Sequence, residues 1–423
     1  DSKYIIKNAS VFDGLGSDKF QADILVEDGI IKEIGNLQNI DCKVIDIKGN
    51  AIAPGFIDVH SHDDIALIVY PEMDFKVMQG VTTVINGNCG NNVIPRHGTL
   101  ERWQTRYPDN PIPEWNSYSD YIDLINSIKP SVNSAILIGH GSVRNGSGLK
   151  NQKRLPSQNE YDEMKGWIKE GMEAGAVGFS TGLIYEPGRY SSTEEIIELT
   201  KVISSYDGVY SSHMRNEGNN LLLSIEETIK IGQGAETSIE ISHHKVSGKD
   251  NWGLSEKSTE MINEARDNGI NVHSDQYPYI AGQSALFAIH QNNAFNEGEG
   301  GLGTVSGDKV IIAHAPIMPE YEGKKLSDIC DDFDLPEQQT AEKILLQDPH
   351  VLAIIEGMCE EDLITILSNP HTMIGSDGVP ASGANPHPRL YGCFPRVLGK
   401  YAREEKIISM ETAIYKMTGL PAK

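Results

Sequence analysis

The sequence of 423 residues predicts an α/β fold in which a small N-terminal β domain precedes a (β/α)8 TIM barrel. From Gly55 onward, short apolar runs alternate with longer amphipathic segments, which is the pattern of βα units around a parallel sheet. The residues before Gly55 hold only short β-type runs separated by turn residues. We therefore place the β domain at 1–54 and the barrel at 55–423.

Four runs rich in β-branched and aromatic residues predict the β domain. They are Tyr4–Phe12, Ala22–Glu27, Ile30–Ile34 and Lys43–Ile47. Asp28 and Gly29 separate the second run from the third, and Asp-Gly between two such runs is a hairpin signal. These runs suit a small antiparallel sheet.

Eight further runs are candidate barrel strands, and eight is the number that closes such a barrel. They are Gly55–Val59, Val81–Ile85, Ser134–Ile138, Ala176–Phe179, Val209–Ser212, Thr237–Ile241, Ile270–His273 and Thr372–Gly375. Two intervening helices carry capping boxes, formed by Ser157 with Glu160 and by Ser192 with Glu195. The stretch at about 280–370 is too long for one crossover. We interpret it as an insertion over the barrel mouth that contains an extra strand at Val310–Ala313 and two or three helices.

Composition excludes several classes of protein. The chain carries 36 Lys and Arg against 60 Asp and Glu, a formal charge of -24, and has no basic stripe that would bind nucleic acid. No run approaches the roughly 18 apolar residues that a membrane helix needs. The five cysteines are odd in number and form no Cys-x-x-Cys pair, so we expect no disulfide framework and a cytoplasmic location. The alternative is a periplasmic or exported protein whose signal peptide was removed before Asp1, and the sequence leaves the oligomeric state open.

Residues that commonly bind metals follow five of the predicted strands at their carboxyl ends. They are His60 and His62 after the first strand, Cys89 after the second, His213 and His243 after the fifth and sixth, and Asp377 after the eighth. A lone cysteine is more often a core residue and a single His-x-His is more often incidental. In a barrel, however, these strand ends converge on one mouth, where active sites are built. Imidazole, thiolate and carboxylate are ligands of zinc, so the joint placement predicts a metal-dependent barrel.

The segment Ala53-Pro-Gly-Phe-Ile-Asp-Val-His60-Ser-His62 resembles the first-strand signature of the amidohydrolase superfamily. Further segments narrow the resemblance to the N-acyl-D-amino-acid deacylase (D-aminoacylase) family. They are Gly80-Val-Thr-Thr-Val-Ile-Asn-Gly-Asn-Cys89-Gly, Gly139-His-Gly141, Gly175-Ala-Val-Gly-Phe-Ser-Thr-Gly-Leu-Ile-Tyr185-Glu-Pro-Gly188, Ser212-His213-Met-Arg-Asn-Glu217, Ile241-Ser-His243-His-Lys245, Asp275-Gln-Tyr277-Pro-Tyr279, Gly375-Ser-Asp377-Gly and His387-Pro-Arg389-Leu-Tyr-Gly-Cys-Phe-Pro-Arg396. The similarity spans nearly the whole chain.

The resemblance implies zinc-dependent hydrolysis of the amide bond of N-acyl-D-amino acids to a D-amino acid and a carboxylate. It assigns a tightly bound zinc to Cys89, His213 and His243, and a second, weaker metal position to His60 and His62. Asp377 would accept the proton of a metal-activated water and return it to the departing amine. The family pattern places recognition of the substrate carboxylate at Lys245, Tyr277 (or Tyr279) and Arg389. His140 and Tyr185 match motif positions that either line the pocket or pack behind it.

Other interpretations stay open at this point. Arg389 could instead pair with a structural acid such as Asp377 or Glu356, and His244 is expected to face away from the mouth. The fourth strand, Gly178-Phe-Ser-Thr-Gly182, lacks the lysine that bridges two metals in many members of the superfamily. This argues against a cyclic amide hydrolase of the hydantoinase or dihydroorotase type, and the third alternative is an idle barrel that binds its ligand without cleaving it. The resemblance also implies a β-sandwich whose C-terminal half, expected after Lys423, is apparently absent from this sequence.

Overall fold

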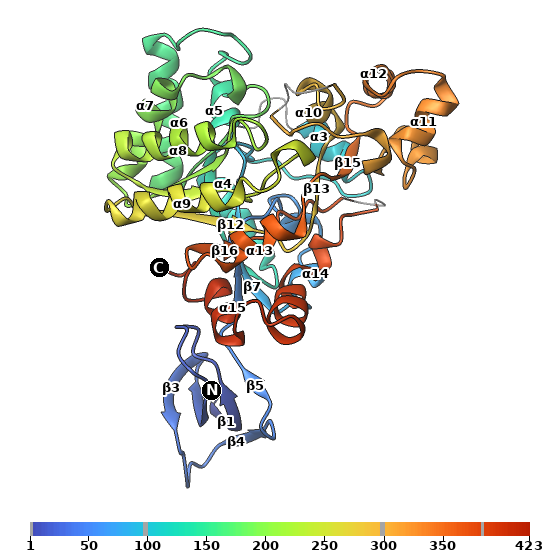
Figure 1. Ribbon diagram of the computed structural model, residues 1–423. Helices are drawn as coiled ribbons and strands as arrows, with labels where there is room; N and C mark the ends of the chain where they lie inside the picture. The colour runs from blue at the N-terminus through green and yellow to red at the C-terminus, as the bar shows by residue number, and fades with distance from the viewer. Residues whose placement is uncertain (1–2, 96–99, 297–300, 382–384) are drawn as a thin grey trace. The chain divides into compact units, whose positions relative to one another are not determined.

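The computed structural model describes residues 3–95, 100–296, 301–381 and 385–423. Contacts between residues divide the chain into two compact units (Figure 1). The smaller unit holds Asp1–Ile57 together with Phe394–Lys423, and the larger unit holds Asp58–Cys393. The predicted boundary after residue 54 lies close to the one after Ile57, but the sequence did not indicate that the C-terminal segment belongs with the smaller unit.

The smaller unit contains one five-stranded sheet. Its strands are β1 (Lys3–Val11), β2 (Phe20–Glu27), β3 (Ile30–Gly35), β4 (Lys43–Asp46) and β5 (Ala51–Ile52). β1 pairs antiparallel with β2 but parallel with β4 and β5, so the sheet is mixed rather than antiparallel as predicted. Asp28 and Gly29 turn between β2 and β3 with φ angles of 53° and 76°, as a hairpin turn of type I′ requires. Among the described residues, no second sheet faces this one as in a sandwich.

An eight-stranded parallel sheet follows, which confirms the predicted barrel. Its strands are β6 (Phe56–Asp58), β7 (Val81–Asn86), β8 (Asn133–Gly139), β9 (Gly178–Gly182), β10 (Val209–His213), β11 (Ser238–Ile241), β12 (Val272–Gln276) and β16 (Thr372–Ile374). The order from β6 to β12 and then β16 follows the sequence. Beyond the first and last strands, Ser61 and Gly378 form a parallel bridge, and the Asp377 amide donates to the His60 carbonyl at 2.7 Å. The barrel is therefore nearly closed at its mouth.

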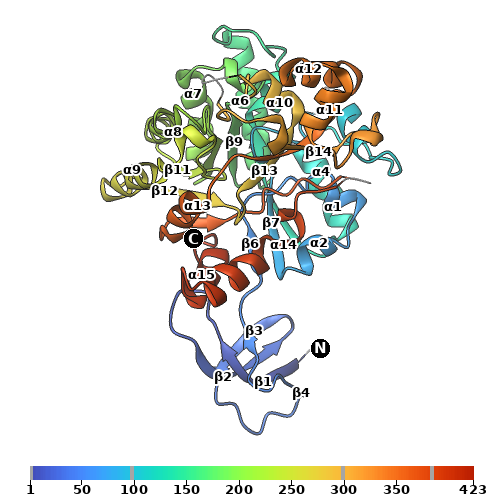
Figure 2. The ribbon, with the colours of Figure 1, turned by 45° about the vertical axis from the view of Figure 1, so that its right-hand side comes forward.

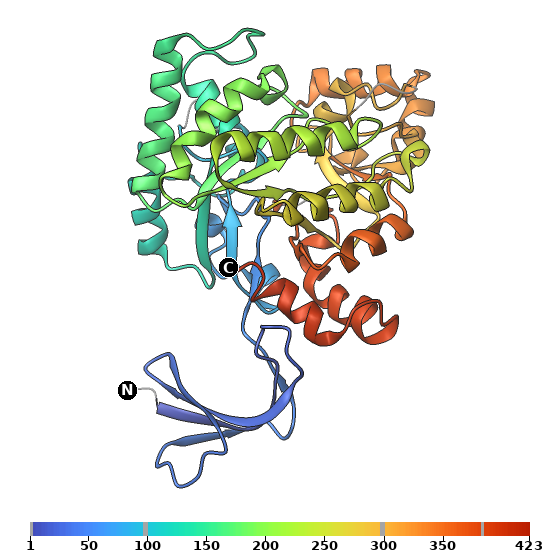
Figure 3. The ribbon, with the colours of Figure 1, turned by 60° about the vertical axis from the view of Figure 1, so that its left-hand side comes forward.

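Amphipathic helices cover the outside of the barrel (Figure 3). They are α4 (Tyr118–Ile128), α6 (Gln158–Glu173), α7 (Thr193–Ser204), α8 (Leu221–Ala235), α9 (Ser255–Asp267) and α13 (Glu360–Ser368). The predicted capping box at Ser157 and Glu160 is present with both reciprocal hydrogen bonds. At the start of α7 only half of the predicted box forms, because the Glu195 carboxylate turns inward to His140 and Arg144 instead of capping Ser192.

The insertion between β12 and β16 forms a small subdomain with its own core. Its sheet runs in the order β13 (Ala281–Ala285), β15 (Leu352–Glu356) and β14 (Val310–His314), all antiparallel. It also contains helices α10 (Leu286–Gln291), α11 (Leu326–Phe333) and α12 (Glu337–Gln347). Its core is apolar and includes Leu286, Ile289, Val310, Ile312, Leu326, Ile329 and Ile344. The stretch contains the extra strand and the helices that the sequence predicted, and Figure 2 shows them gathered on one side of the larger unit.

Shorter helices complete the chain. They are α1 (Ala66–Val69), α2 (Asp74–Val77), α3 (Leu100–Arg106), α5 (His140–Gly146), α14 (Arg389–Arg396), a π-helical segment at Val397–Glu404 and α15 (Met410–Met417). Among the described residues, no helix has both the length and the apolar character that a membrane span requires.

Candidate metal centre

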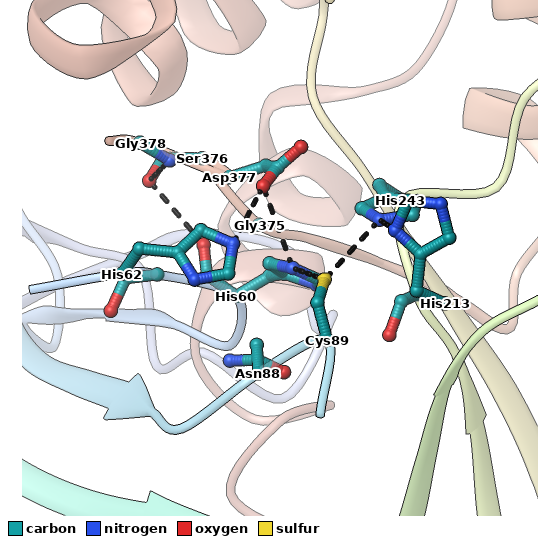
Figure 4. A network of polar contacts seen from close by, with 12 residues as sticks. His60, His62, Asn88, Cys89, His213, His243, Gly375, Ser376, Asp377 and Gly378 are labelled. Atoms are coloured by element: carbon teal, nitrogen blue, oxygen red, sulfur yellow. Dashed lines mark hydrogen bonds and ion pairs between the residues drawn. The ribbon is translucent and has the colours of Figure 1, made fainter. Parts of the chain in front are cut away.

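The six residues that the sequence placed at the barrel mouth lie together in the structure (Figure 4). They come from the carboxyl ends of strands that are distant in sequence: β6, β7, β10, β11 and β16. Their positions follow from the parallel barrel, because every strand of such a sheet ends on the same side. The predicted convergence is therefore what the structure shows.

Two groups of ligand atoms share the Cys89 thiol. In the first group, the ligand atoms of Cys89, His213 and His243 lie within 4.8 Å of one another, and the second group joins Cys89 to His60 and His62 within the same limit. The Cys89 sulfur is 3.5 Å from His243 Nε2 and 3.3 Å from His60 Nε2. His213 Nδ1 is 2.8 Å from His243 Nε2. The arrangement provides two adjacent positions for metal ions, with Cys89 between them.

The turn Asn86–Gly90 fixes the Cys89 thiol at the mouth. Gly87 and Gly90 both have positive φ angles, 76° and 72°, and a Cβ atom on Gly87 would lie 2.0 Å from the Leu137 carbonyl oxygen. Only glycine fits there. Burial alone would raise the pKa of the Cys89 thiol, but His60, His213 and His243 outweigh it and hold this pKa well below its usual range. Cys89 is therefore poised as a thiolate, the form that binds metals.

Two carboxylates behind the histidines fix the orientation of their rings. Asp275 Oδ2 is 3.1 Å from His60 Nδ1, and Glu217 Oε1 is 3.0 Å from His243 Nδ1. Carboxylates in such contacts fix the tautomer and orientation of metal-binding imidazoles. Both acids lie within the family-like segments of the sequence, but no role was predicted for either. The available signal for Asp275 was its place near the carboxyl end of β12, beside the other strand-end residues.

Asp377 lies beside both histidines of the second group. Its Oδ1 is 3.1 Å from His62 Nε2 and 3.6 Å from His60 Nε2, and its Oδ2 is 2.8 Å from Arg389 Nη1. Burial acts to raise the pKa of Asp377, but the Arg389 charge and the histidines hold it well below its usual range. The carboxylate is therefore ionised at neutral pH and can accept a proton.

Arg389 is not among the residues that line the cavity, and the expectation that it grips the substrate carboxylate stays a prediction. Its side chain is buried, its guanidinium pairs with Asp377, and the guanidinium carbon lies 4.4 Å from the centre of the Tyr277 ring. This is the alternative that the sequence left open. Tyr277 and Lys245 do line the cavity, and Lys245 Nζ is 2.6 Å from Glu217 Oε1.

The remaining predicted residues divide between the cavity and the protein interior. Tyr185 lines the cavity, and its hydroxyl is 3.3 Å from His213 Nδ1. His140 does not line it, because its ring is fully buried and its Nε2 is 3.1 Å from the Glu195 carboxylate. His140 therefore packs behind the site. His244 faces away from the mouth as expected, with its Nε2 2.9 Å from the Ser258 hydroxyl.

A buried lysine that sequence reasoning missed joins the two strand ends that carry His60 and Asp377. Lys76 Nζ lies 2.6 Å from Asp58 Oδ2, 3.1 Å from Asp63 Oδ2 and 2.9 Å from the Ser376 hydroxyl. Asp58 in turn accepts hydrogen bonds from the backbone amides of Ser376 and His60, at 2.8 and 3.3 Å. Nothing in the local sequence Asp-Phe-Lys-Val marks this lysine as part of the network.

A cavity of about 500 Å³ opens onto these groups. Volumes of roughly 300–1,000 Å³ are typical of small-molecule sites. His62, Cys89, His213, His243 and Asp377 form the barrel part of its wall. The insertion supplies apolar residues to the same wall, among them Phe287, Leu352 and Ile355. The cavity therefore places a small ligand between the metal-binding groups and the insertion.

Comparisons with known proteins agree with this geometry. Residues 43–201 match the model of the amidohydrolase family. A D-aminoacylase from Alcaligenes xylosoxydans xylosoxydans is 36% identical over 99% of this chain and 83% of its own length. The N-acyl-D-glutamate deacylase structure from Bordetella bronchiseptica, complexed with zinc and a phosphonate inhibitor that mimics the tetrahedral intermediate, superposes with a TM-score of 0.89 at 33% identity. That superposition covers 100% of this chain and 85% of the other.

A second structure bears on the metal. A D-aminoacylase with a binuclear metal centre, in which one metal activates and the second attenuates, superposes with a TM-score of 0.88 at 34% identity, over 100% of this chain and 85% of that one. Sequence identity above 30% to these relatives extends across nearly the whole chain, and the barrel fold and the two candidate groups of metal ligands agree with it. The chain therefore belongs to the D-aminoacylase (N-acyl-D-amino-acid deacylase) family of metal-dependent amidohydrolases.

Proposed function

We propose that the protein is a zinc-dependent deacylase that hydrolyses N-acyl-D-amino acids to a D-amino acid and a carboxylate. The observation that carries this proposal is the Cys89 thiol shared by two groups of ligand atoms, beside an ionised Asp377 and an open cavity. The missing lysine on β9 counts against the cyclic amide hydrolases, because Cys89 supplies the anionic ligand in its place.

The donor set fits zinc. Two imidazoles and a thiolate are common zinc ligands, and a catalytic site with three protein ligands keeps one position open. The ring nitrogen of His213 that faces this group is Nδ1, which lies 2.8 Å from His243 Nε2 and 3.3 Å from the Tyr185 hydroxyl. We assign the tightly bound zinc to Cys89, His213 and His243. A second, weaker metal is assigned to His60, His62 and Cys89.

The chemistry divides between the metal and the chain. A bound zinc ion supplies Lewis acidity to the scissile carbonyl and activates water at neutral pH. Asp377 then takes the proton of the attacking water and returns it to the nitrogen of the leaving amine, which is the exchange that general acid–base catalysis requires. Arg389 keeps Asp377 ionised, and His62 holds its other oxygen.

The α-carboxylate of the substrate is assigned to Lys245 and Tyr277. Both line the cavity, and Lys245 Nζ lies 5.7 Å from the centre of the Tyr277 ring, so a cation and a hydroxyl are available on the same wall. Tyr185 lines the cavity beside His213 and is assigned to the acyl side of the scissile bond. The preference for D-amino acids is proposed because the relatives act on N-acyl-D-amino acids.

The test is amine release from matched N-acetyl-D- and N-acetyl-L-amino acids by zinc-loaded protein, with a chelator-treated sample as control. Metal-dependent release from the D-enantiomer supports the reaction, the cofactor and the handedness together. Hydrolysis of hydantoins or dihydroorotate alone would show that the protein is a cyclic amide hydrolase instead. Tight binding of N-acyl amino acids without release would indicate an idle barrel.

A further inference from the structure

The cavity contains a cation that the proposed chemistry does not use. Arg106 is the last residue of α3, and its side chain lines the cavity. Within the described residues, no hydrogen bond or ion pair joins its guanidinium to a protein group. Burial lowers the pKa of Arg106, and the one group that acts in the opposite sense is Tyr107. A partly buried charge without a protein partner is unfavourable unless a ligand or water supplies one.

The other cations near the metal centre already have partners. Lys245 pairs with Glu217 at 2.6 Å, and Arg389 pairs with Asp377 at 2.8 Å. Lys245 lines the cavity and is already assigned to the α-carboxylate of the substrate, whereas Arg389 does not line the cavity. Among the described side chains of the cavity wall, Arg106 is therefore the arginine or lysine that has neither a protein partner nor an assigned group of the ligand.

His314, the last residue of β14, is a second polar side chain that lines the cavity. It is 5% exposed and lines the cavity, and its Nε2 has no hydrogen-bond partner in the described structure. Its Nδ1 is 3.2 Å from Glu322 Oε1. Burial lowers the pKa of His314, Glu322 opposes this effect, and the charge of Arg106 adds to it. Arg106 and His314 are thus two polar side chains in a wall that also carries Trp103 and Phe287.

We propose that Arg106 binds a second carboxylate of the substrate, so that the cavity selects dicarboxylic N-acyl amino acids. This inference rests on the proposed function, because Lys245 and Tyr277 are taken to hold the first carboxylate. The second carboxylate is carried either by the amino-acid side chain or by the acyl group, and its chemistry is the same in both. The planar guanidinium suits this task, since it donates two parallel hydrogen bonds to one carboxylate.

A structural role for Arg106 makes a different prediction. As the last residue of α3, it could act only through the partial negative charge at the helix end. That role would change the stability of the protein, and it would not distinguish one substrate from another. Comparing substrates that differ in a single charge therefore separates the two roles.

The experiment measures kcat/KM for two matched pairs of substrates with zinc-loaded protein. The first pair, N-acetyl-D-glutamate and N-acetyl-D-glutamine, varies the side chain. The second pair, N-succinyl-D-leucine and its succinamoyl counterpart, varies the acyl group. The variants are Arg106→Gln, Arg106→Lys and, as a control, Arg403→Gln, which removes an exposed arginine paired with Glu404.

We expect the acid to exceed its amide by about 10- to 100-fold in one of the two pairs, the range of a hydrogen bond between charged groups. Arg106→Gln should abolish that preference by slowing the acid alone, and Arg106→Lys should retain part of it. Arg403→Gln should behave as the wild type. The proposal is overturned if neither acid is preferred, or if Arg106→Gln slows both members of a pair equally.

Binding gives a readout that does not depend on turnover. Calorimetry with the phosphonamidates of the same four compounds, in which tetrahedral phosphorus replaces the scissile carbon, should show the same preference and its loss in Arg106→Gln. If the protein cleaves none of the substrates but still prefers the acidic phosphonamidate through Arg106, the proposed function fails and the Arg106 site stands. Equal binding of acid and amide would exclude the Arg106 site whatever the activity.

Discussion

Replacement of Lys76 by methionine tests whether the buried lysine stabilises the barrel mouth. Lys76 is fully buried, and its ammonium contacts Asp58, Asp63 and Ser376 at 2.6, 3.1 and 2.9 Å. Methionine keeps nearly the same length and removes the charge. Two buried carboxylates would then face each other without a cation.

The expected loss of unfolding free energy is large. Removing one partner of a buried ion pair costs about 3–5 kcal/mol, because the other charge stays buried and uncompensated. By contrast, Lys169→Met removes an exposed lysine that lies 3.7 Å from Glu173, and pairs of this kind contribute about 0.5 kcal/mol or less. Lys169 therefore provides a matched control for the chemical change itself.

The loss should also depend on pH, and its direction follows from linkage. Burial alone would lower the pKa of Lys76, but Asp58 and Asp63 raise it. The contribution of Lys76 to the free energy of unfolding is therefore constant below the ordinary lysine pKa of about 10.4. Burial already raises the pKa of Asp63 while Lys76 opposes this effect, so removal of the lysine charge raises the folded-state pKa of Asp63 further above the unfolded value of about 3.9. Protonation of Asp63 then favours the folded state at low pH, and stability falls as pH rises. The variant should lose more at pH 8 than at pH 5.

Urea unfolding followed by tryptophan fluorescence measures this loss, because the tryptophans report on the structural unit that contains Lys76. All four tryptophans, Trp103, Trp115, Trp167 and Trp252, belong to the unit formed by Asp58–Cys393. The reasoning is refuted if Lys76→Met and Lys169→Met lose the same free energy, or if the loss caused by Lys76→Met does not change between pH 5 and pH 8.

Three further predictions concern the metal centre. Cys89→Ser should reduce bound zinc at both positions, measured by metal analysis after dialysis, because both groups share this thiol; unchanged zinc content would exclude Cys89 as a ligand. Asp377→Asn should retain zinc but lower kcat by about 100- to 10,000-fold, the usual contribution of a general base, and full activity would remove Asp377 from the mechanism. Arg389→Ala should slow N-acyl amino acids and their amides equally, because Arg389 pairs with Asp377 rather than facing the cavity. The pKa of Asp377 should then rise, so the acidic limb of the rate profile should move to higher pH, and an unmoved limb would contradict the ion pair.

The sequence was sufficient to place the candidate metal-binding residues because their positions depend on topology alone. Once eight parallel strands are recognised, residues such as His213 and His243 at strand ends must share one mouth, whatever their neighbours are. The hairpin at Asp28 and Gly29 was predictable for a similar reason, since the turn is specified by two adjacent residues.

The sequence could not show which partner each side chain would choose. Glu195 fits a capping box, yet it turns inward because His140 and Arg144 are buried beside it. Arg389 fits a carboxylate-binding motif, yet in the structure its guanidinium forms an ion pair with Asp377. Lys76 lies in a short helix far in sequence from Ser376, so its network exists only after the barrel closes. Partners of this kind are set by tertiary contacts rather than by local pattern.

The backbone at the metal centre shows why these positions resist local prediction. Cys89, His243 and Asp377 have φ angles of 56°, 36° and 49°, a region that costs residues with a side chain about 1 kcal/mol or more. Glycine would fit each position without this cost, but glycine offers no thiol, imidazole or carboxylate. Closure of the barrel offsets the cost at Asp377, whose amide donates to the His60 carbonyl across the joined strand ends. The chain therefore accepts local strain at these three positions, where the chemistry needs the side chain.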